Sequence, residues 1–128
     1  KNKKLFYSGA NRPLFIVEKD SETLTEIKAT KLPVGGGQYE TNREYQLHTI
    51  ELNKNMVAYL CTDGYADQFG GPKRKKYLST QLQKNFKEIS KLSPSGQKKK
   101  LDENYMEWKG SLEQIDDVCI IGINFDTA

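Results

Sequence analysis

Two apolar runs in this chain have no polar face, and each lies next to a short acidic motif. Met56 to Cys61 is followed by Thr62-Asp63-Gly64, and Val118 to Ile123 is preceded by Asp116-Asp117. A short run that is apolar on both sides predicts a strand covered on both faces, in the interior of a sheet. If the two strands pair in antiparallel fashion, both acidic motifs lie at the same end of that sheet.

Shorter apolar runs before Met56 predict further strands. Turn-rich segments at Ser8–Pro13 and Asp20–Glu22 separate them, which favours antiparallel hairpins. The runs are Leu5–Tyr7, Leu14–Val17 and the mixed run Tyr45–Leu52. Pro33–Gly37 predicts a loop, and because no Gly-Lys-Ser/Thr follows its three glycines, it is not a nucleotide-binding P-loop.

Two helical patterns lie between the two interior strands. The first has apolar residues three or four positions apart, as does the second: Leu78, Leu82, Phe86, Ile89 and Leu92, then Leu101, Tyr105, Trp108 and Leu112. Ser93 as N-cap and Pro94 at the first helical position start the second helix, and Gly110 can end it. The order of elements predicts an α+β fold, with an antiparallel β-sheet and a pair of helices packed on it.

Length and composition place limits on this picture. The chain has 128 residues, 36% hydrophobic and 29% charged, which suits one globular domain. No apolar stretch approaches the roughly 20 residues that span a bilayer, so we expect no membrane insertion by this segment, and no signal peptide is evident. The first residue is not methionine, and we expect the chain to be part of something longer.

The net charge of +3 is unevenly distributed. Lys73 to Lys100 contains ten basic residues and one acidic residue, Glu88. Such a segment could contact nucleic acid, a phosphoprotein or an acidic membrane surface, but a solvated helical face is the favoured interpretation. Because the segment lacks a recognition motif and interleaved aromatic residues, we expect no nucleic-acid partner.

The cysteines and the single histidine suggest no zinc site. Cys61 and Cys119 both lie in apolar runs, which favours buried thiols in a reducing cytoplasm, although a disulfide is possible if their strands are neighbours. With His48 the only histidine, zinc ligands at suitable spacing are lacking. His48 could act as a general acid, but its mixed strand favours a surface position.

The acidic motifs have two interpretations on residue chemistry alone. Oxygen ligands suit Mg²⁺ or Mn²⁺, and two such ions can share a water, lower its pKa and direct it at a phosphate ester without a side-chain nucleophile. Asp-Gly is also a common turn dipeptide, and Asp-Asp before a strand can be exposed loop charge.

Three segments together resemble the metal-dependent serine/threonine phosphatases of the 2C type, in their sporulation-protein-E-like bacterial branch. They are Tyr7–Leu14, Tyr59–Gly71 and Glu113–Val118. Pro72–Lys76 and Glu107–Gly110 are similar to variants fused to sensor modules in bacterial two-component regulators. The resemblance covers nearly the whole chain and is more specific than either acidic motif alone.

This resemblance implies an α-β-β-α sandwich with two Mn²⁺ or Mg²⁺ ions at one edge. It makes Asp63 and Asp116 metal ligands, and gives Asp117 the role of orienting a ligand or water. Gly64 would allow the tight turn after Asp63. Asp67 and Gln68 lie near enough in sequence to be candidates for the same site.

The chain also departs from the family pattern. Lys54-Asn55 replaces the usual Gly-Asp before the strand that leads to Asp63. The family's upstream Asp-Gly metal motif is missing, and the only earlier aspartate is Asp20. We therefore expect residues 1–128 to be the C-terminal portion of a single catalytic domain, inactive by itself and prone to self-association through uncovered sheet surface.

The resemblance implies a parent enzyme that removes phosphate from serine or threonine. Its partner would be a phosphorylated signalling protein, such as an anti-sigma-factor antagonist. The location would be cytoplasmic, either free or as the cytoplasmic part of a membrane-anchored sensor. The alternative is a degenerate, non-catalytic phosphatase fold that serves protein association.

Overall fold

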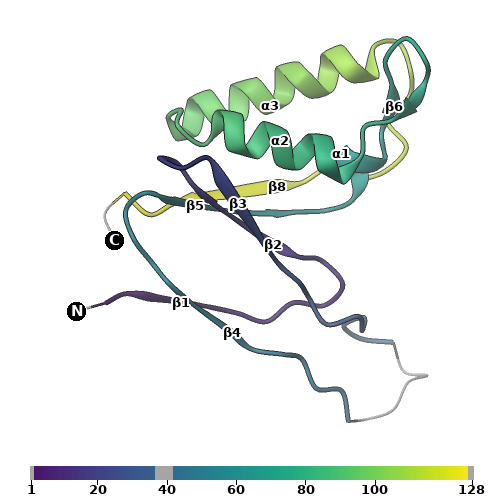
Figure 1. Cartoon of the computed structure of the whole chain (residues 1–128). Coiled ribbons are helices and arrows are strands. Elements are labelled where there is room, and N and C mark those ends of the chain that lie inside the picture. The colour runs from purple at the N-terminus through teal and green to yellow at the C-terminus, as the bar shows by residue number, and fades with distance from the viewer. Residues whose placement is uncertain (1, 37–41, 127–128) are drawn as a thin grey trace.

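A computed structural model describes residues 2–36 and 42–126 of the chain. Its first half consists of strands, and its second half contains both helices and strands (Figure 1). In order they are β1 (Lys4–Tyr7), β2 (Leu14–Glu18), β3 (Thr23–Ile27), β4 (His48–Glu51), β5 (Met56–Cys61), α1 (Gly64–Asp67), β6 (Phe69–Gly70), β7 (Lys75–Lys76), α2 (Ser79–Ile89), α3 (Pro94–Lys109) and β8 (Ile120–Asn124).

A four-stranded antiparallel sheet with the order β3-β2-β5-β8 forms the centre of the fold. Helices α2 and α3 lie along one face of this sheet, and the two-stranded β1–β4 ribbon lies on the other side (Figure 1). The predicted α+β fold with an antiparallel sheet and a helical pair is confirmed. These layers correspond to the helix, sheet and sheet part of an α-β-β-α sandwich.

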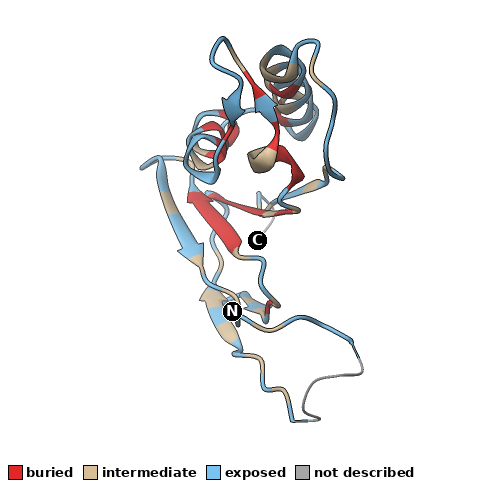
Figure 2. Cartoon of the chain, turned by 90° about the vertical axis from the view of Figure 1, so that its right-hand side faces the viewer, coloured by how far each residue is buried: buried red, intermediate tan, exposed pale blue. Residues whose placement is uncertain are grey.

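The two inner strands contribute to a core on each face of the sheet. All residues of β2 except Glu18, and all of β5 except Leu60, are buried (Figure 2). Because side chains alternate along a strand, neighbouring residues contribute to different cores. The core under the helices includes Phe15, Val17, Val57 and Tyr59, and the opposite one includes Leu14, Ile16, Met56 and Ala58.

The predicted interior position is confirmed for β5 and wrong for β8. Within the described residues, β8 pairs only with β5 and forms an edge of the sheet. Ile121 and Ile123 are 52% and 41% exposed. The apolar pattern predicted cover on both faces, but in the described part of the chain no residue of β8 is buried and no further strand pairs with it.

The two helices match the predicted caps and the middle of each predicted stripe, but Leu78 precedes α2 and Leu112 lies beyond the end of α3. In α2, Phe86 is fully buried and its ring stacks on Tyr59 with centroids 4.2 Å apart. Helix α3 starts as predicted, since Ser93 Oγ accepts a hydrogen bond from the Gly96 N–H at 3.2 Å. Leu92, which the periodicity placed on the first helix, lies beyond its end and is exposed.

Strand partners in the first half differ from simple consecutive hairpins. The expected hairpin across Asp20–Glu22 forms, but its second strand is β3, a polar alternating segment that is not an apolar run. Across Ser8–Pro13 no hairpin forms, because β1 pairs with β4 instead of β2. The β1–β4 ribbon contributes partly buried residues, among them Leu5 and Ile50, to the core on the second face.

The cysteines are free, and only one is buried. Cys61 is buried as expected, whereas Cys119 is exposed, so the prediction of a second buried thiol is wrong. Cys61 is opposite Ile120 in the β5–β8 register. Cys119, one residue earlier, therefore points to the other face of the sheet, which does not favour a Cys61–Cys119 disulfide.

The structure also locates His48 and the glycine loop. His48 lies on β4 with intermediate burial, and its Nε2 atom is buried without a hydrogen-bond partner among the described residues. Gly35 and Gly36 have positive φ angles, as a glycine loop predicts, while Gly37 lies outside the described residues.

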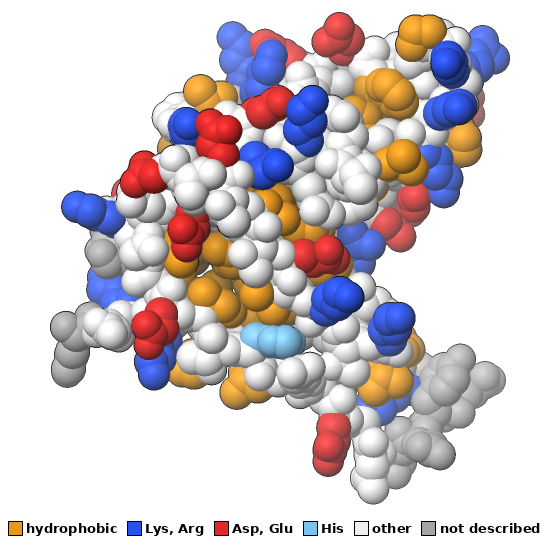
Figure 3. Space-filling view, in the orientation of Figure 1, with side chains coloured by type: hydrophobic (Ala, Val, Ile, Leu, Met, Phe, Trp, Pro, Cys, Tyr) orange, Lys and Arg blue, Asp and Glu red, His pale blue; other side chains and the backbone are white. Residues whose placement is uncertain are grey.

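The lysines and arginines are interspersed with acidic side chains over the visible surface (Figure 3). Of the described helices, none has the length and apolarity needed to cross a membrane.

Candidate functional site

Strand pairing brings the two acidic motifs to one end of the sheet. Strand β5 pairs with β8 in antiparallel fashion, and Cys61 at the end of β5 is opposite Ile120 at the start of β8. Asp63 follows the first strand and Asp116 precedes the second. The predicted convergence of the two strand ends is therefore confirmed.

Gly64 permits a close backbone approach between the two motifs. A Cβ atom at this position would lie 2.3 Å from the Asp117 carbonyl oxygen and 3.2 Å from that of Asp116. Any side chain would overlap backbone atoms, which cannot move aside as a flexible side chain can. The Gly64 position thus lets helix α1 begin directly against the Asp116–Asp117 segment.

Thr62 links the same two segments by hydrogen bonds. Its hydroxyl donates to the Asp117 carbonyl at 2.9 Å and accepts from the Cys119 N–H at 3.0 Å. Its backbone N–H also donates to the Cys119 carbonyl at 3.0 Å. The β5–β8 pairing is therefore extended past the ends of the strands to the residue before Asp63.

The two candidate ligands differ in their local bonding. Asp63 occupies the N-cap position of α1, but its side chain makes no capping hydrogen bond. In Asp116, Oδ1 accepts from the Asp117 N–H at 2.7 Å, and the carbonyl accepts from Gln114 Nε2 at 2.9 Å. Both aspartates are exposed. These contacts order the Asp116 turn while the Asp63 carboxylate remains available at the surface.

The other two candidates have different surroundings. Asp67 forms an ion pair with Lys76 at 3.1 Å, and it lines the same surface hollow as Asp63, which is described below. Gln68 is fully buried: Tyr105 OH donates to its Oε1 at 2.8 Å, and its Nε2 donates to the Glu113 carbonyl at 2.8 Å. These contacts indicate that Gln68 supports the loop that leads to Asp116.

The donor set fits part of a hard-metal site. Asp63 and Asp116 supply carboxylate oxygens, the ligand type that Mg²⁺ and Mn²⁺ prefer, and the soft donors near them are the thiols of Cys61 and Cys119. Burial raises the pKa of the Cys61 thiol, with a smaller opposing effect from Arg12, so the thiol stays protonated. Among residues 2–36 and 42–126, no group of three or more potential metal-ligating side chains is found. The described chain thus offers an incomplete set of oxygen donors.

A hollow of about 400 Å³ adjoins Asp63 and includes a residue that sequence reasoning missed. It is lined by Arg12, Pro13, Glu26, Asp63, Ala66, Asp67, Leu78 and Ser79. Arg12 comes from the loop after β1, far from Asp63 in sequence. A polar residue in an irregular loop has no periodic signal, so only the fold places it here.

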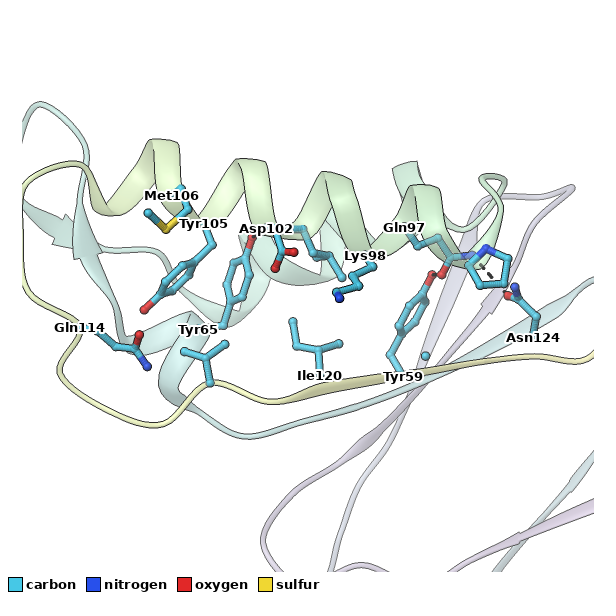
Figure 4. Close-up of a pocket in the computed structure, with 14 residues that line it drawn as sticks. Tyr59, Tyr65, Gln97, Lys98, Asp102, Tyr105, Met106, Gln114, Ile120 and Asn124 are labelled. Atoms are coloured by element: carbon cyan, nitrogen blue, oxygen red, sulfur yellow. Dashed lines mark hydrogen bonds between the residues drawn. The ribbon is translucent and has the colours of Figure 1, made fainter.

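A larger hollow, about 550 Å³, lies between α3 and strands β5 and β8 (Figure 4). None of the four candidate residues Asp63, Asp67, Gln68 and Asp116 lines it. Tyr59 OH, which points into this region, donates to Gln97 Oε1 at 2.8 Å. Its size alone therefore does not make it the site suggested by the acidic motifs.

Comparison with known proteins identifies the family and fold of the chain. The family model described as "Stage II sporulation protein E (SpoIIE)" matches residues 1–126. The SiaA-PP2C domain of Pseudomonas aeruginosa is 25% identical with a TM-score of 0.85, covering 96% of this chain and 47% of that one. The SpoIIE phosphatase domain from Bacillus subtilis is 16% identical with a TM-score of 0.62, covering 96% and 51%.

A third structure, the same Bacillus subtilis domain presoaked with Mn, is 17% identical with a TM-score of 0.59, covering 95% of this chain and 56% of that one. No curated protein gave a significant match. The chain spans about half the length of the solved structures that it matches. With the family model covering nearly every residue, this chain belongs to the stage II sporulation protein E (SpoIIE) family.

Proposed function

We propose that this chain is the C-terminal half of a metal-dependent protein phosphatase domain. Asp63 and Asp116 would supply carboxylate ligands to Mn²⁺ or Mg²⁺, and the remaining donors would come from the preceding half. The observation that supports this most directly is the close contact of Gly64 with the Asp116–Asp117 backbone, which fixes both acidic motifs at one sheet edge. Family membership and the PP2C fold of the matched structures support the same assignment.

The end of the sheet where Asp63 and Asp116 lie is called the acidic edge below, and each of its residues would have a distinct role. The bound metals would supply a water of lowered pKa for in-line attack on a phosphate ester. Asp63 and Asp116 would hold and orient the ions, while Asp117 and the Thr62 hydroxyl would fix the backbone that presents Asp116. No side chain of the chain would serve as a nucleophile.

The open edge of β8 supports the proposal of a second half. Ile121 and Ile123 are large apolar side chains that remain exposed on a strand that, among residues 2–36 and 42–126, pairs on one side only. Such an edge is usually covered or paired in a complete domain. Hydrophobic side chains are also visible between the sheet and the β1–β4 ribbon (Figure 3).

The proposed substrate is phosphoserine or phosphothreonine on a signalling protein, such as an anti-sigma-factor antagonist. The parent would act in the cytoplasm, in free form or attached to a sensor. In this proposal the isolated 128-residue chain binds Mn²⁺ weakly and hydrolyses phosphate esters negligibly, because it contains only part of the donor set. It tends to self-associate because part of its sheet is uncovered.

The test compares the whole parent protein with substitutions at the acidic edge. Asp63→Asn and Asp116→Asn should each lower Mn²⁺-dependent hydrolysis of p-nitrophenyl phosphate by at least about a hundredfold, because each removes a charged ligand. Asp20→Asn is the matched control: this aspartate lies in the β2–β3 turn, at the opposite end of the sheet. It should leave turnover unchanged.

Two results would contradict the proposal. Metal-dependent turnover by the isolated 128-residue chain would refute the half-site. A folded parent protein with no measurable Mn²⁺ binding by calorimetry would instead support the alternative, a non-catalytic phosphatase fold that serves protein association.

A further inference from the structure

Arg12 is anchored beside the acidic edge by contacts with the end of β5. Its Nε donates to the Cys61 carbonyl at 3.0 Å, and Nη2 lies 3.9 Å from the Cys61 sulfur. Cys61 is two residues before Asp63. The guanidinium is thus held at the same end of the sheet as the candidate metal ligands, although it comes from the loop between β1 and β2.

Arg12 forms no ion pair with a carboxylate within the described part of the chain, although Glu26, Asp63 and Asp67 line the same hollow. The cations of the recorded ion pairs are Lys19, Lys76, Lys91 and Lys99. A guanidinium has five N–H donors, and the contacts with Cys61 use only some of them. The remaining donors are available to an anion.

The hollow next to Asp63 gives those donors a place to bind one. Its volume of about 400 Å³ can hold a phosphate group, and Arg12, Ser79 and Asp63 all line it. Ser79 Oγ accepts from Gln83 Nε2 at 3.3 Å, so its own hydroxyl proton can be donated elsewhere. Two further carboxylates line the hollow: Asp67, which is paired with Lys76, and Glu26 on β3, whose negative charge Arg12 must outweigh for an anion to bind.

We propose that Arg12 binds the non-bridging oxygens of the substrate's phosphate monoester, with the Ser79 hydroxyl as a second donor. The proposal rests on the proposed function, since it places the phosphate beside Asp63. Planar guanidinium groups match the paired oxygens of phosphate, and such charge-assisted bonds are stronger than neutral ones. Because these oxygens carry charge before and during the reaction, Arg12 should contribute mainly to substrate binding.

A purely structural role for Arg12 makes a different prediction. The Nε hydrogen bond to Cys61 could simply attach the β1–β2 loop to β5, and its loss would then lower stability without changing affinity for phosphate. The experiment must therefore separate phosphate binding from folding.

The test uses the whole parent protein with Arg12→Ala, Arg12→Lys and the control Arg74→Ala, which removes an arginine from the exposed β6–β7 turn. Arg12→Ala should raise KM for p-nitrophenyl phosphate and the inhibition constant for inorganic phosphate about tenfold or more, the loss expected for one charge-assisted contact. The kcat should change by less than about threefold, as for loss of uniform binding. Arg12→Lys should be intermediate, and added guanidinium ion should partly restore Arg12→Ala.

The outcomes distinguish this proposal from the proposed function. Unchanged KM and phosphate inhibition in Arg12→Ala, with a lowered melting temperature, would overturn the phosphate role. If the wild-type parent hydrolyses no phosphate ester, the proposed function fails, and the role of Arg12 is then tested by measuring inorganic phosphate binding with phosphorus NMR. Equal phosphate affinity in wild type and Arg12→Ala would refute the phosphate-binding role of Arg12, while weaker binding in the variant would support it.

Discussion

Replacing Thr62 with valine should loosen the acidic edge without changing its charge or volume. The substitution removes the hydroxyl that donates to the Asp117 carbonyl and accepts from the Cys119 N–H. Valine has nearly the same shape as threonine and is favourable in extended backbone. The loss of hydrogen bonding is therefore the main effect.

The expected cost follows from the two bonds. Each intramolecular hydrogen bond contributes about 0.5–1.5 kcal/mol net, so the loss of both should lower the free energy of unfolding by about 1–3 kcal/mol. Asp117 and Cys119 are exposed, and water can replace part of the lost bonding. We therefore expect a value in the lower half of this range, which corresponds to a fall in the urea midpoint on the order of 1 M or less.

Urea unfolding followed by tyrosine and tryptophan fluorescence measures this change. Thr62→Ser retains the hydroxyl and should cost less than the valine variant. Thr25→Val is the matched control, because Thr25 is an exposed threonine on β3 with no role at the acidic edge, and it should change stability by less than about 0.5 kcal/mol. If Thr62→Val is no less stable than Thr62→Ser and Thr25→Val, the hydroxyl does not hold the two motifs together.

Two further predictions concern the core behind this edge and the two thiols. Gln68→Leu should lower the free energy of unfolding by about 2–4 kcal/mol, because Tyr105 OH and the Glu113 carbonyl lose buried partners. The control Gln83→Leu on α2 should change the free energy of unfolding little. Equal urea midpoints for the two variants would contradict the role given to Gln68. A chromogenic disulfide reagent should modify one thiol of the folded protein, Cys119, and two in urea. Burial raises the pKa of Cys61 and thus suppresses its reactive thiolate, so Cys119→Ser should reduce the folded count to zero, and a folded wild-type count of two would refute the buried position.

Hydrophobic periodicity predicted the central elements of the fold because they obey strong local rules. The run Met56–Cys61 has no polar face and is an inner strand, and Ser93-Pro94 starts α3 as expected. Partner choice was not accessible in the same way. β1 pairs with β4 although β2 and β3 lie between them in sequence, and no local pattern encodes that pairing. The position of β8 at an edge likewise depends on which other strands are present.

The candidate site was predictable only as far as its residues lie next to predicted strands. Asp63 and Asp116 flank β5 and β8, so antiparallel pairing alone places them at one end. Gln68 was grouped with them by sequence proximity, whereas the structure shows it bonded inside the core. Arg12 lies in a segment that carries the family resemblance but was not a candidate site residue, because its place beside Asp63 depends on a contact with Cys61 that is distant along the chain.

The contacts that order the acidic edge are made by the backbone and by Thr62, not by the carboxylates themselves. Gly64 and Thr62 fix the two segments, while the Asp63 side chain makes no capping bond. Two like charges held near one another are unfavourable in the absence of a cation. Substitutions at Thr62 and at Asp63 should therefore change stability in opposite ways. Thr62→Val should lower the free energy of unfolding in metal-free buffer. Asp63→Asn should leave it unchanged or raise it, and should abolish the stabilisation by added Mn²⁺. Residues whose charge opposes folding but whose position is tightly supported are characteristic of functional sites. For that reason, a metal-free gain in stability for Asp63→Asn would be stronger evidence for a ligand role than loss of activity alone.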